Sequence, residues 1–320
     1  MLFRLLKAYA RFALRIYCRR VIVNQPDLLK RTGPVLYAAN HPNSFLDGII
    51  LTTLLDAPLY SLARGDVFRN PRARRWLHRL RLLPVYRPSE GPENLVHNYS
   101  TFEACKEVFA DGKQVIIFSE GRCINEWHLR PLRKGTARLA IGTWEKGIDL
   151  TVVPLGFNYN AFRNFGKNVF LNFGPPLDRD RVLGEQGEGR QLLAFNAQLE
   201  AGLRELVYEI PKNDLAAQKA QLHVPVPFMK KVLLALPAAL GWLLHAALYY
   251  GVKAFTLARF NNDHFDSVVA TALMMAYPLY LVLVVTLGLL VAGWWGFALL
   301  ALLPFTAWAC VQVKKQGSEW

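Results

Sequence analysis

The chain has 320 residues, 52% of them hydrophobic, and its 38 Lys and Arg against 24 Asp and Glu give a formal net charge of +14. This hydrophobic content is high for a purely water-soluble enzyme, and the length allows one large domain or two. The four cysteines lack a C-x-x-C spacing, so neither a disulfide framework nor a zinc site is predicted. No nucleic-acid motif accompanies the basic charge, so nucleic acid is not an expected partner.

The first segment is basic and apolar. Among its Leu, Phe, Tyr and Ala residues stand six cations: Arg4, Lys7, Arg11, Arg15, Arg19 and Arg20. This pattern is typical of a helix that lies in an anionic membrane surface. We therefore assign residues 1–30 to an amphipathic membrane-surface helix with anionic lipids as partners. A second arginine cluster, Arg69–Arg81, is either a solvated helix face or a contact for lipid phosphates or an acidic carrier protein.

Between residues 31 and 225, short β-branched runs alternate with helical patterns. The predicted strands are Val35–Ala39, Leu59–Leu62, Leu82–Tyr86, Gln114–Phe118, Leu150–Pro154 and Val169–Phe173. The predicted helices are Phe45–Leu55, Pro71–Leu80, Asn94–Ala110, Lys134–Lys146 and Arg190–Glu209. This order predicts an α/β domain with a mainly parallel or mixed sheet covered by helices. A surface loop is predicted at Leu183–Arg190, and a linker at Pro211–Pro227.

Residues 226–320 are strongly apolar. No Asp, Glu, Lys or Arg occurs from Val232 to Val252 or from Val268 to Val313. A helix needs about 20 apolar residues to span a bilayer, so the first run can cross once and the second can cross twice, as a hairpin that turns near Gly293. This region is therefore predicted to be a helical membrane domain.

His41 and Asp47 are the first candidates for chemistry. They belong to the sequence N-H-P-N-S-F-L-D, which follows a predicted strand. The Pro-Asn pair after the histidine provides a turn, and a helix that begins at Ser44 places Asp47 on its first turn, within reach of His41. A histidine oriented by a carboxylate can act as a general base. The alternative is structural, because S-F-L-D is also a capping box, with Ser44 as the cap and Asp47 folded back on it.

The second candidate is F-S-E-G, residues 118–121, at the end of another predicted strand. Taken alone, it can be a polar turn. Glycine, however, lets backbone N–H groups approach an anion closely. Basic residues also gather after it: Arg122, Arg130, Arg133 and Lys134. A phosphate-bearing substrate fits this concentration of positive charge.

Four blocks, in order, resemble the glycerolipid acyltransferases, the family that includes 1-acylglycerol-3-phosphate and glycerol-3-phosphate acyltransferases. The blocks are Asn40-His41 through Asp47, Arg64–Phe68 with Leu83–Arg87, Phe118–Gly121 with Pro131–Gly135, and Val152–Leu155. Four ordered blocks are far more specific than any one of them. The resemblance covers about half of the chain, and it identifies residues 31–225 as an acyltransferase domain with His41 and Asp47 as its catalytic pair.

Two positions depart from the family pattern. Five residues separate His41 from Asp47, where the family usually has four; this is similar to a branch that includes eukaryotic glycerol-3-phosphate acyltransferases. The third block usually continues Gly-Thr-Arg, whereas this chain has Gly121-Arg122-Cys123. The arginine therefore stands one position early. Both departures bear on the identity of the acceptor more than on the type of reaction.

The resemblance implies acyl transfer from a thioester carried by coenzyme A or by acyl carrier protein. His41, oriented by Asp47, would take the proton from an acceptor hydroxyl, which attacks the thioester carbonyl without an acyl-enzyme. The positions that match the family's acceptor site are Arg87, Glu120 and Gly121, and Arg122 is added as a candidate. No cofactor and no metal ion is implied.

The acceptor expected from the resemblance is a lysophospholipid, first 1-acylglycerol-3-phosphate, with glycerol-3-phosphate or another lysolipid as alternatives. A membrane-anchored lipid-binding scaffold without turnover is a second class, and the intact His41 and Asp47 count against it. A hydrolase is a third class. It needs a nucleophilic Ser or Cys beside the base, and neither Ser44 nor Cys123 lies in a nucleophile-elbow sequence.

Cations flank the apolar runs. They occur at Arg4–Arg20, Lys230-Lys231 and Lys314-Lys315. By the positive-inside rule, this distribution predicts a membrane protein whose catalytic domain faces the cytoplasm. The rule and the hydropathy agree if Val268–Val313 spans as a hairpin and Val232–Val252 only partly enters the bilayer.

Overall fold

The computed structural model describes residues 1–86 and 97–316. In this part of the chain seven strands form one sheet: β1 (Cys18–Val23), β2 (Val35–Ala39), β3 (Leu59–Arg64), β4 (Leu82–Val85), β5 (Gln114–Phe118), β6 (Thr151–Tyr159) and β7 (Lys167–Phe173). The strand order is β1-β7-β6-β2-β5-β3-β4. Every neighbouring pair is parallel except β6 and β7, which are antiparallel. The predicted α/β class with a mixed sheet is confirmed.

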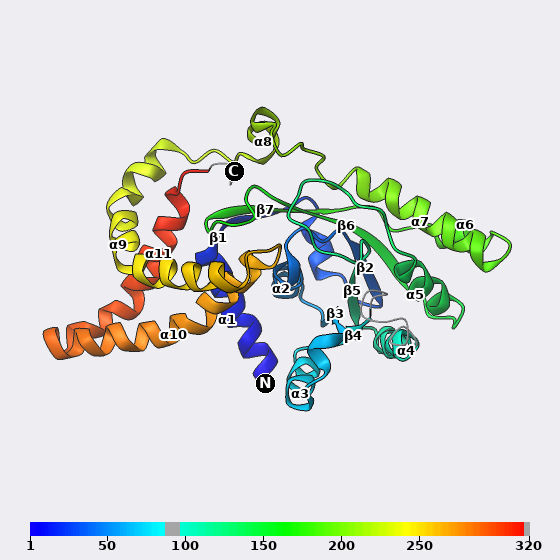
Figure 1. Cartoon of the computed structure of the whole chain (residues 1–320), viewed down its shortest axis with the longest axis horizontal. Helices are drawn as coiled ribbons and strands as arrows, with labels where there is room; N and C mark the ends of the chain where they lie inside the picture. Colours follow the sequence, from blue (N-terminus) through cyan, green and yellow to red (C-terminus); the bar gives the residue numbers. More distant parts are fainter. Residues whose placement is uncertain (87–96, 317–320) are drawn as a thin grey trace.

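Helices cover both faces of the sheet (Figure 1). The first face packs against α1 (Leu2–Tyr17), α2 (Ser44–Leu54) and the start of α10 (Phe265–Ala292). The second face packs against α4 (His97–Ala110), α5 (Gly135–Trp144) and α7 (Glu188–Arg204). Tyr37 of β2 lies in the first core and Leu36 in the second. Because successive side chains of a strand point to opposite faces, this central strand is apolar at every position.

The remaining helical segments are η1 (Pro26–Lys30), η2 (Gly65–Phe68), α3 (Pro71–Arg79), α6 (Arg179–Leu183), α8 (Leu215–Leu222), α9 (Phe228–Arg259), η5 (Gly293–Ala298) and α11 (Leu299–Val313). Two of them correct the sequence-based predictions. The predicted loop Leu183–Arg190 is restricted to residues 184–187, because α6 ends and α7 begins within it. The predicted linker Pro211–Pro227 contains α8. Aspartates begin both short helices, since Asp178 accepts the Arg181 N–H and Asp214 accepts the Ala217 N–H.

A strand was not predicted at Cys18–Val23, yet β1 follows α1 directly and pairs with β7 at one edge of the sheet. Its two arginines continue the basic pattern of the preceding helix and hide the strand signal. Arg19 is nevertheless buried, and its Nε donates to Asn168 Oδ1 at 3.0 Å.

The C-terminal region forms a bent helix and a hairpin. α9 curves beside the sheet, and α10 runs away from it before the chain turns back through η5 into α11 (Figure 1). The turn begins at Gly293, whose φ of +58° is a left-handed conformation that glycine adopts without strain. By length and composition, Phe228–Arg259 and Phe265–Val313 are each sufficient to cross a membrane. The predicted apolar helices are therefore present.

The C-terminal region contacts the sheet domain before and after its hairpin. Between α9 and α10, Asn261 Oδ1 accepts from Arg163 at 2.9 Å, and near the end of α11 Gln312 Nε2 donates to Arg19 O of β1 at 3.3 Å. After α11, Gln316 Oε1 accepts from Asn168 Nδ2 at 2.9 Å. The tip of the hairpin, in contrast, exposes large apolar side chains: Leu290, Val291, Trp294 and Trp295 are 78–89% exposed.

Candidate active site

The two candidate motifs meet where strands β2 and β5 end. These strands are parallel neighbours, with Ala39 opposite Phe118. One residue further on, the Ser119 N–H donates to Ala39 O at 2.8 Å. Because the carboxyl ends of parallel strands lie at the same edge of a sheet, the loops that follow them converge. His41 and Glu120 therefore come together although 79 residues separate them.

His41 and Asp47 are in direct contact. α2 begins at Ser44 and carries Asp47 on its first turn. His41 Nδ1 lies 3.0 Å from Asp47 Oδ2, and the imidazole stacks on Phe118 with ring centroids 3.8 Å apart. The Asp47 side chain is completely buried, whereas that of His41 is 12% exposed. The histidine ring is thus fixed between an aromatic ring and a carboxylate but keeps an open edge.

Asp47 receives two further hydrogen bonds. The Asn43 N–H donates to Oδ2 at 3.0 Å, and the Tyr159 hydroxyl donates to Oδ1 at 2.5 Å. These donors compensate the burial of the carboxylate. When Nδ1–H also donates to Asp47, the lone pair of the neutral imidazole is on Nε2. This arrangement presents Nε2 as a base at the edge of the sheet.

The capping-box alternative is wrong in its details. The N-cap residue of α2 is Asn43, which makes no side-chain cap hydrogen bond. Asp47 folds back on the Asn43 N–H rather than on Ser44. The Ser44 hydroxyl instead lies 2.7 Å from His264 Nδ1. Asp47 Oδ2 therefore contacts both the loop backbone, at the Asn43 N–H, and the ring of His41.

Glu120 joins the loops around the site. Its Oε2 accepts the His41 N–H and its Oε1 accepts the Arg130 N–H, both at 2.9 Å. Burial raises the pKa of Glu120 to about 7, against an opposing effect of the two backbone N–H groups. Both carboxylate oxygens are thus occupied by the protein. The role of Glu120 in binding an acceptor stays a prediction.

The other predicted substrate-binding residues lie close to this loop or outside the described residues. Gly121 has a φ of +66°, and its N–H donates to Phe118 O at 3.0 Å, so this N–H is already used within the turn. Arg122 is exposed beside it, as are Arg133 and Lys134. Arg87 lies outside the described residues. Among the described residues, no group of three or more His, Cys, Asp or Glu side chains is placed to hold a metal ion.

Sequence reasoning missed the residues that support the pair from far away in the chain. Tyr159 contacts Asp47 across 112 residues, and the N-terminal end of α10 contacts the His41–Asp47 segment through His264, Asp266 and Ser267. One signal was present: Asp266 is an acidic residue directly before a long apolar run. Such a charge is retained at the start of a membrane helix when it has a partner.

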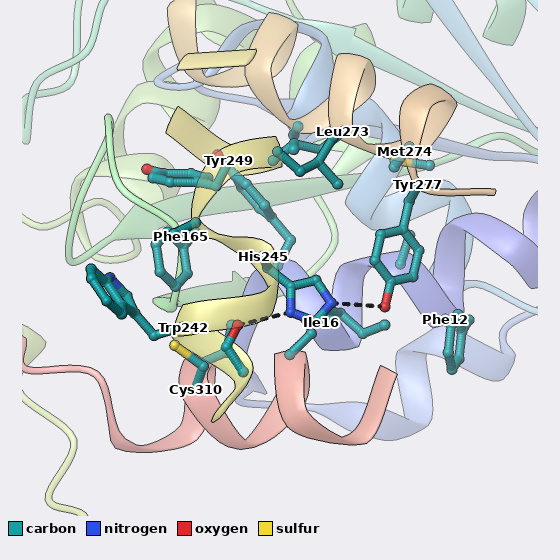
Figure 2. Close-up of a pocket in the computed structure, with 18 of the residues that line it drawn as sticks. Phe12, Ile16, Phe165, Trp242, His245, Tyr249, Leu273, Met274, Tyr277 and Cys310 are labelled. Carbon is teal, nitrogen blue, oxygen red and sulfur yellow. Dashed lines mark hydrogen bonds between the residues drawn. The ribbon is translucent and has the colours of Figure 1, made fainter. Parts of the chain in front are cut away.

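A separate apolar pocket lies between α1, α9, α10 and α11 (Figure 2). Phe12, Trp242 and Leu273 are among its lining residues. The polar atoms of His245 are paired, since Nδ1 lies 2.8 Å from Gly241 O and Nε2 lies 3.3 Å from the Tyr277 hydroxyl. Neither His41 nor Asp47 lines this pocket.

A comparison with protein families gives one match. The sequence model of the family described as Acyltransferase matches residues 20–158. This segment is therefore similar to an acyltransferase domain. The matched range includes all the predicted site residues: His41, Asp47, Arg87, Glu120, Gly121 and Arg122. The match confirms the family resemblance seen in the sequence.

A comparison with solved structures gives a weaker similarity. The crystal structure of the 1-acyl-sn-glycerophosphate (LPA) acyltransferase PlsC from Thermotoga maritima aligns with a TM-score of 0.40 and 14% sequence identity. The alignment covers 62% of this chain and 77% of that one. No curated protein sequence gives a significant match.

Proposed function

We propose that the chain is a membrane-bound O-acyltransferase that transfers a fatty acyl group from a thioester donor to a hydroxyl of a lysophospholipid. The observation that carries the proposal is the His41–Asp47 pair, 3.0 Å apart, within an acyltransferase domain. Among the described residues, no hydrogen-bond partner occupies His41 Nε2. This nitrogen is available to the hydroxyl of an acceptor.

The chemistry follows from the hydrogen bonds. Nε2 of His41 accepts the proton of the acceptor hydroxyl while the hydroxyl oxygen attacks the thioester carbonyl. Asp47 stabilises the imidazolium that forms, and Tyr159 and the Asn43 N–H hold the carboxylate in place. The tetrahedral intermediate collapses, the C–S bond breaks, and the imidazolium proton neutralises the leaving thiolate. An ester and a free thiol are the products, and no acyl-enzyme is required.

Charge around the site favours an acceptor that carries a phosphate. Arg122, Arg133 and Lys134 are exposed next to the turn after β5. Arginine binds phosphate through paired N–H donors. We propose 1-acylglycerol-3-phosphate as the first candidate acceptor, with glycerol-3-phosphate or another lysolipid as alternatives. Either acyl-CoA or acyl carrier protein provides the thioester.

Attachment to a membrane is proposed from the apolar surface of the C-terminal helices. The exposed tip at Leu290, Val291, Trp294 and Trp295 is unfavourable in water, and tryptophan is common at membrane interfaces. α1 exposes cations such as Arg4 and Arg11 together with apolar side chains such as Leu5, as an interfacial helix does. We propose three parts: an N-terminal segment of residues 1–30, in which only α1 is the surface helix because β1 joins the sheet, the acyltransferase domain in residues 31–225 and the membrane helices in residues 226–320. The acyltransferase domain would face the cytoplasm.

The test uses the purified full-length protein in detergent micelles with acyl-CoA and with acyl carrier protein as donors. Release of free thiol and the mass of the lipid product are followed with 1-acylglycerol-3-phosphate, glycerol-3-phosphate and other lysolipids. Ester formation that depends on both donor and acceptor supports the proposal, and the best acceptor gives the substrate. Thiol release without an acceptor indicates a hydrolase. Lysolipid binding without product for every donor indicates a scaffold.

A further inference from the structure

The first turn of α2 is held by residues of α10, 221 residues later in the chain. The catalytic loop, defined here as Pro42–Ser44, connects His41 to this helix. The first backbone N–H groups of a helix have no acceptor within the helix, and buried ones need an acceptor from elsewhere. Because the N-cap residue Asn43 provides no side-chain cap, that acceptor comes from another segment.

Ser267 is the acceptor. Its Oγ accepts a hydrogen bond from the Leu46 N–H at 3.0 Å and donates one to Asn43 O at 2.8 Å. The hydroxyl thus bridges the last carbonyl before α2 and an amide of its first turn. Ser267 is completely buried, so water does not replace these bonds.

Asp266 holds the same loop through a side chain. Asn43 Nδ2 donates to Asp266 Oδ2 at 2.7 Å. The carboxylate also accepts from the Tyr17 hydroxyl at 2.5 Å and forms an ion pair with Lys167. A buried carboxylate is tolerated when its charge is paired and its oxygens are hydrogen-bonded. Asp266 thereby connects α10 to α1, to β7 and to the catalytic loop.

The catalytic loop depends on such external support. Ser44 has a φ of +51°, a left-handed conformation that is costly for a residue with a side chain and persists only when neighbouring contacts impose it. The loop also determines how Asp47, on the first turn of α2, lies against His41. A displacement of α2 would lengthen the 3.0 Å contact between these two side chains.

We infer that Asp266 and Ser267 are positioning residues for acyl transfer, which act through Asn43 and the first turn of α2 on the His41–Asp47 pair. The inference rests on the proposed function. Both residues lie beyond residues 20–158, the segment that matches the acyltransferase family. The start of the C-terminal hairpin therefore completes the active site of this chain.

The test compares two substitutions that remove a hydrogen-bonding side-chain group with two control substitutions in the full-length protein. Ser267→Ala removes both bonds to the loop, and Asn43→Ala removes the bond to Asp266 while Tyr17 and Lys167 still pair with the carboxylate. Each should lower kcat about tenfold or more and change the KM of donor and acceptor less than about threefold. Ser267→Thr keeps the hydroxyl and should retain most of kcat. Tyr280→Phe removes a hydrogen bond from α10 to Leu244 O, away from the loop, and should leave kcat unchanged.

Hydrogen exchange provides a measurement that is independent of turnover. In Ser267→Ala, the amide of Leu46 should exchange faster than in the wild type, whereas the amides of β5 should not change. Unchanged kcat in both Ser267→Ala and Asn43→Ala overturns the positioning role, and so does an equal loss of kcat in Tyr280→Phe. Absence of acyl transfer in the wild type overturns the proposed function instead, and the exchange rates then decide whether α10 holds the loop.

Discussion

The hydroxyl of Tyr159 donates a hydrogen bond to Asp47 Oδ1, the carboxylate oxygen that does not face His41. Tyr159 is the last residue of β6, next to β2 in the sheet, and its side chain is fully buried. Burial and the nearby Asp47 carboxylate raise the pKa of Tyr159 well above its usual range. The phenol therefore remains a hydrogen-bond donor and holds the carboxylate at the oxygen that does not contact His41.

Removal of this hydroxyl should affect turnover more than folding. We expect Tyr159→Phe to lower kcat by about tenfold, because one hydrogen bond to a charged group contributes roughly 1.5–3 kcal/mol. Acyl-transfer kinetics of the detergent-solubilised protein measure the effect. Tyr37→Phe is the matched control: Tyr37 is buried in the same core, but its hydroxyl contacts Gln114 and no site residue. An equal loss of kcat in both variants would make the effect a general consequence of core packing.

His41 and Asp47 are expected to be essential. His41→Ala removes the base, and Asp47→Asn weakens the partner that orients it, so each should lower turnover by about two orders of magnitude or more. His128→Ala is the control, because His128 also contacts a carboxylate, Glu209 Oε2 at 2.6 Å, but lies on the surface. Near-normal turnover of folded His41→Ala protein would show that another residue is the base.

The sequence was sufficient for the parts of the site whose residues are close in the chain. The apolar runs of β2 and β5 predicted both strands with their observed bounds, and the Pro-Asn turn predicted the approach of His41 to Asp47. Contacts from distant segments were not predictable. No local pattern of Tyr159 or Ser267 distinguishes a residue that supports the catalytic pair from one that fills a core. Only the order of strands in the sheet and the docking of α10 bring them there.

Stability should depend on pH through Glu120. Its pKa of about 7 in the folded protein is above the ordinary value of 4.5, so between these two pH values the folded state binds more protons than the unfolded state. The free energy of unfolding should therefore fall as pH rises from about 4.5 to about 7, by up to about 3 kcal/mol.

Denaturant unfolding in detergent across this pH range measures the effect. At pH 4.5, Glu120→Gln should be less stable than the wild type, because its amide group cannot accept both backbone N–H groups, and this difference should shrink as the pH rises and the wild-type carboxyl group ionises. The variant should also lack the Glu120 part of the pH dependence. Equal pH slopes in the two proteins would contradict the raised pKa.

The acceptor's phosphate should be bound by arginine. We expect Arg122→Ala and Arg87→Ala to raise the acceptor KM much more than the donor KM, and the corresponding Lys variants to restore binding only in part, because lysine lacks the two-pronged donor geometry. Steady-state kinetics with each substrate varied in turn provide the measurement. Arg190→Ala, an exposed arginine in the first turn of α7, controls for the loss of one positive charge. Equal changes in both KM values would place the phosphate site elsewhere.

The orientation in the membrane can be tested at the two ends and at the tip of the hairpin. Asn262 precedes α10 and Lys315 follows α11. Their neighbours Asn261 and Gln316 contact the acyltransferase domain, so both ends should lie in the cytoplasm. The 28 residues of α10 extend over about 42 Å, which exceeds the roughly 30 Å thickness of the hydrocarbon core. Trp294 at the tip should therefore reach the opposite face.

Labelling of single introduced cysteines with a membrane-impermeant thiol reagent distinguishes these positions. Cys310 is the least buried of the four native cysteines, so Cys310→Ala provides the background. In intact cells, Asn262→Cys and Lys315→Cys should remain unlabelled and Trp294→Cys should react, whereas all three should react after the membrane is disrupted. Both thioester donors are cytoplasmic, and the ends of the hairpin lie beside the site that uses them. Labelling of Asn262→Cys or Lys315→Cys in intact cells would therefore contradict the proposed orientation.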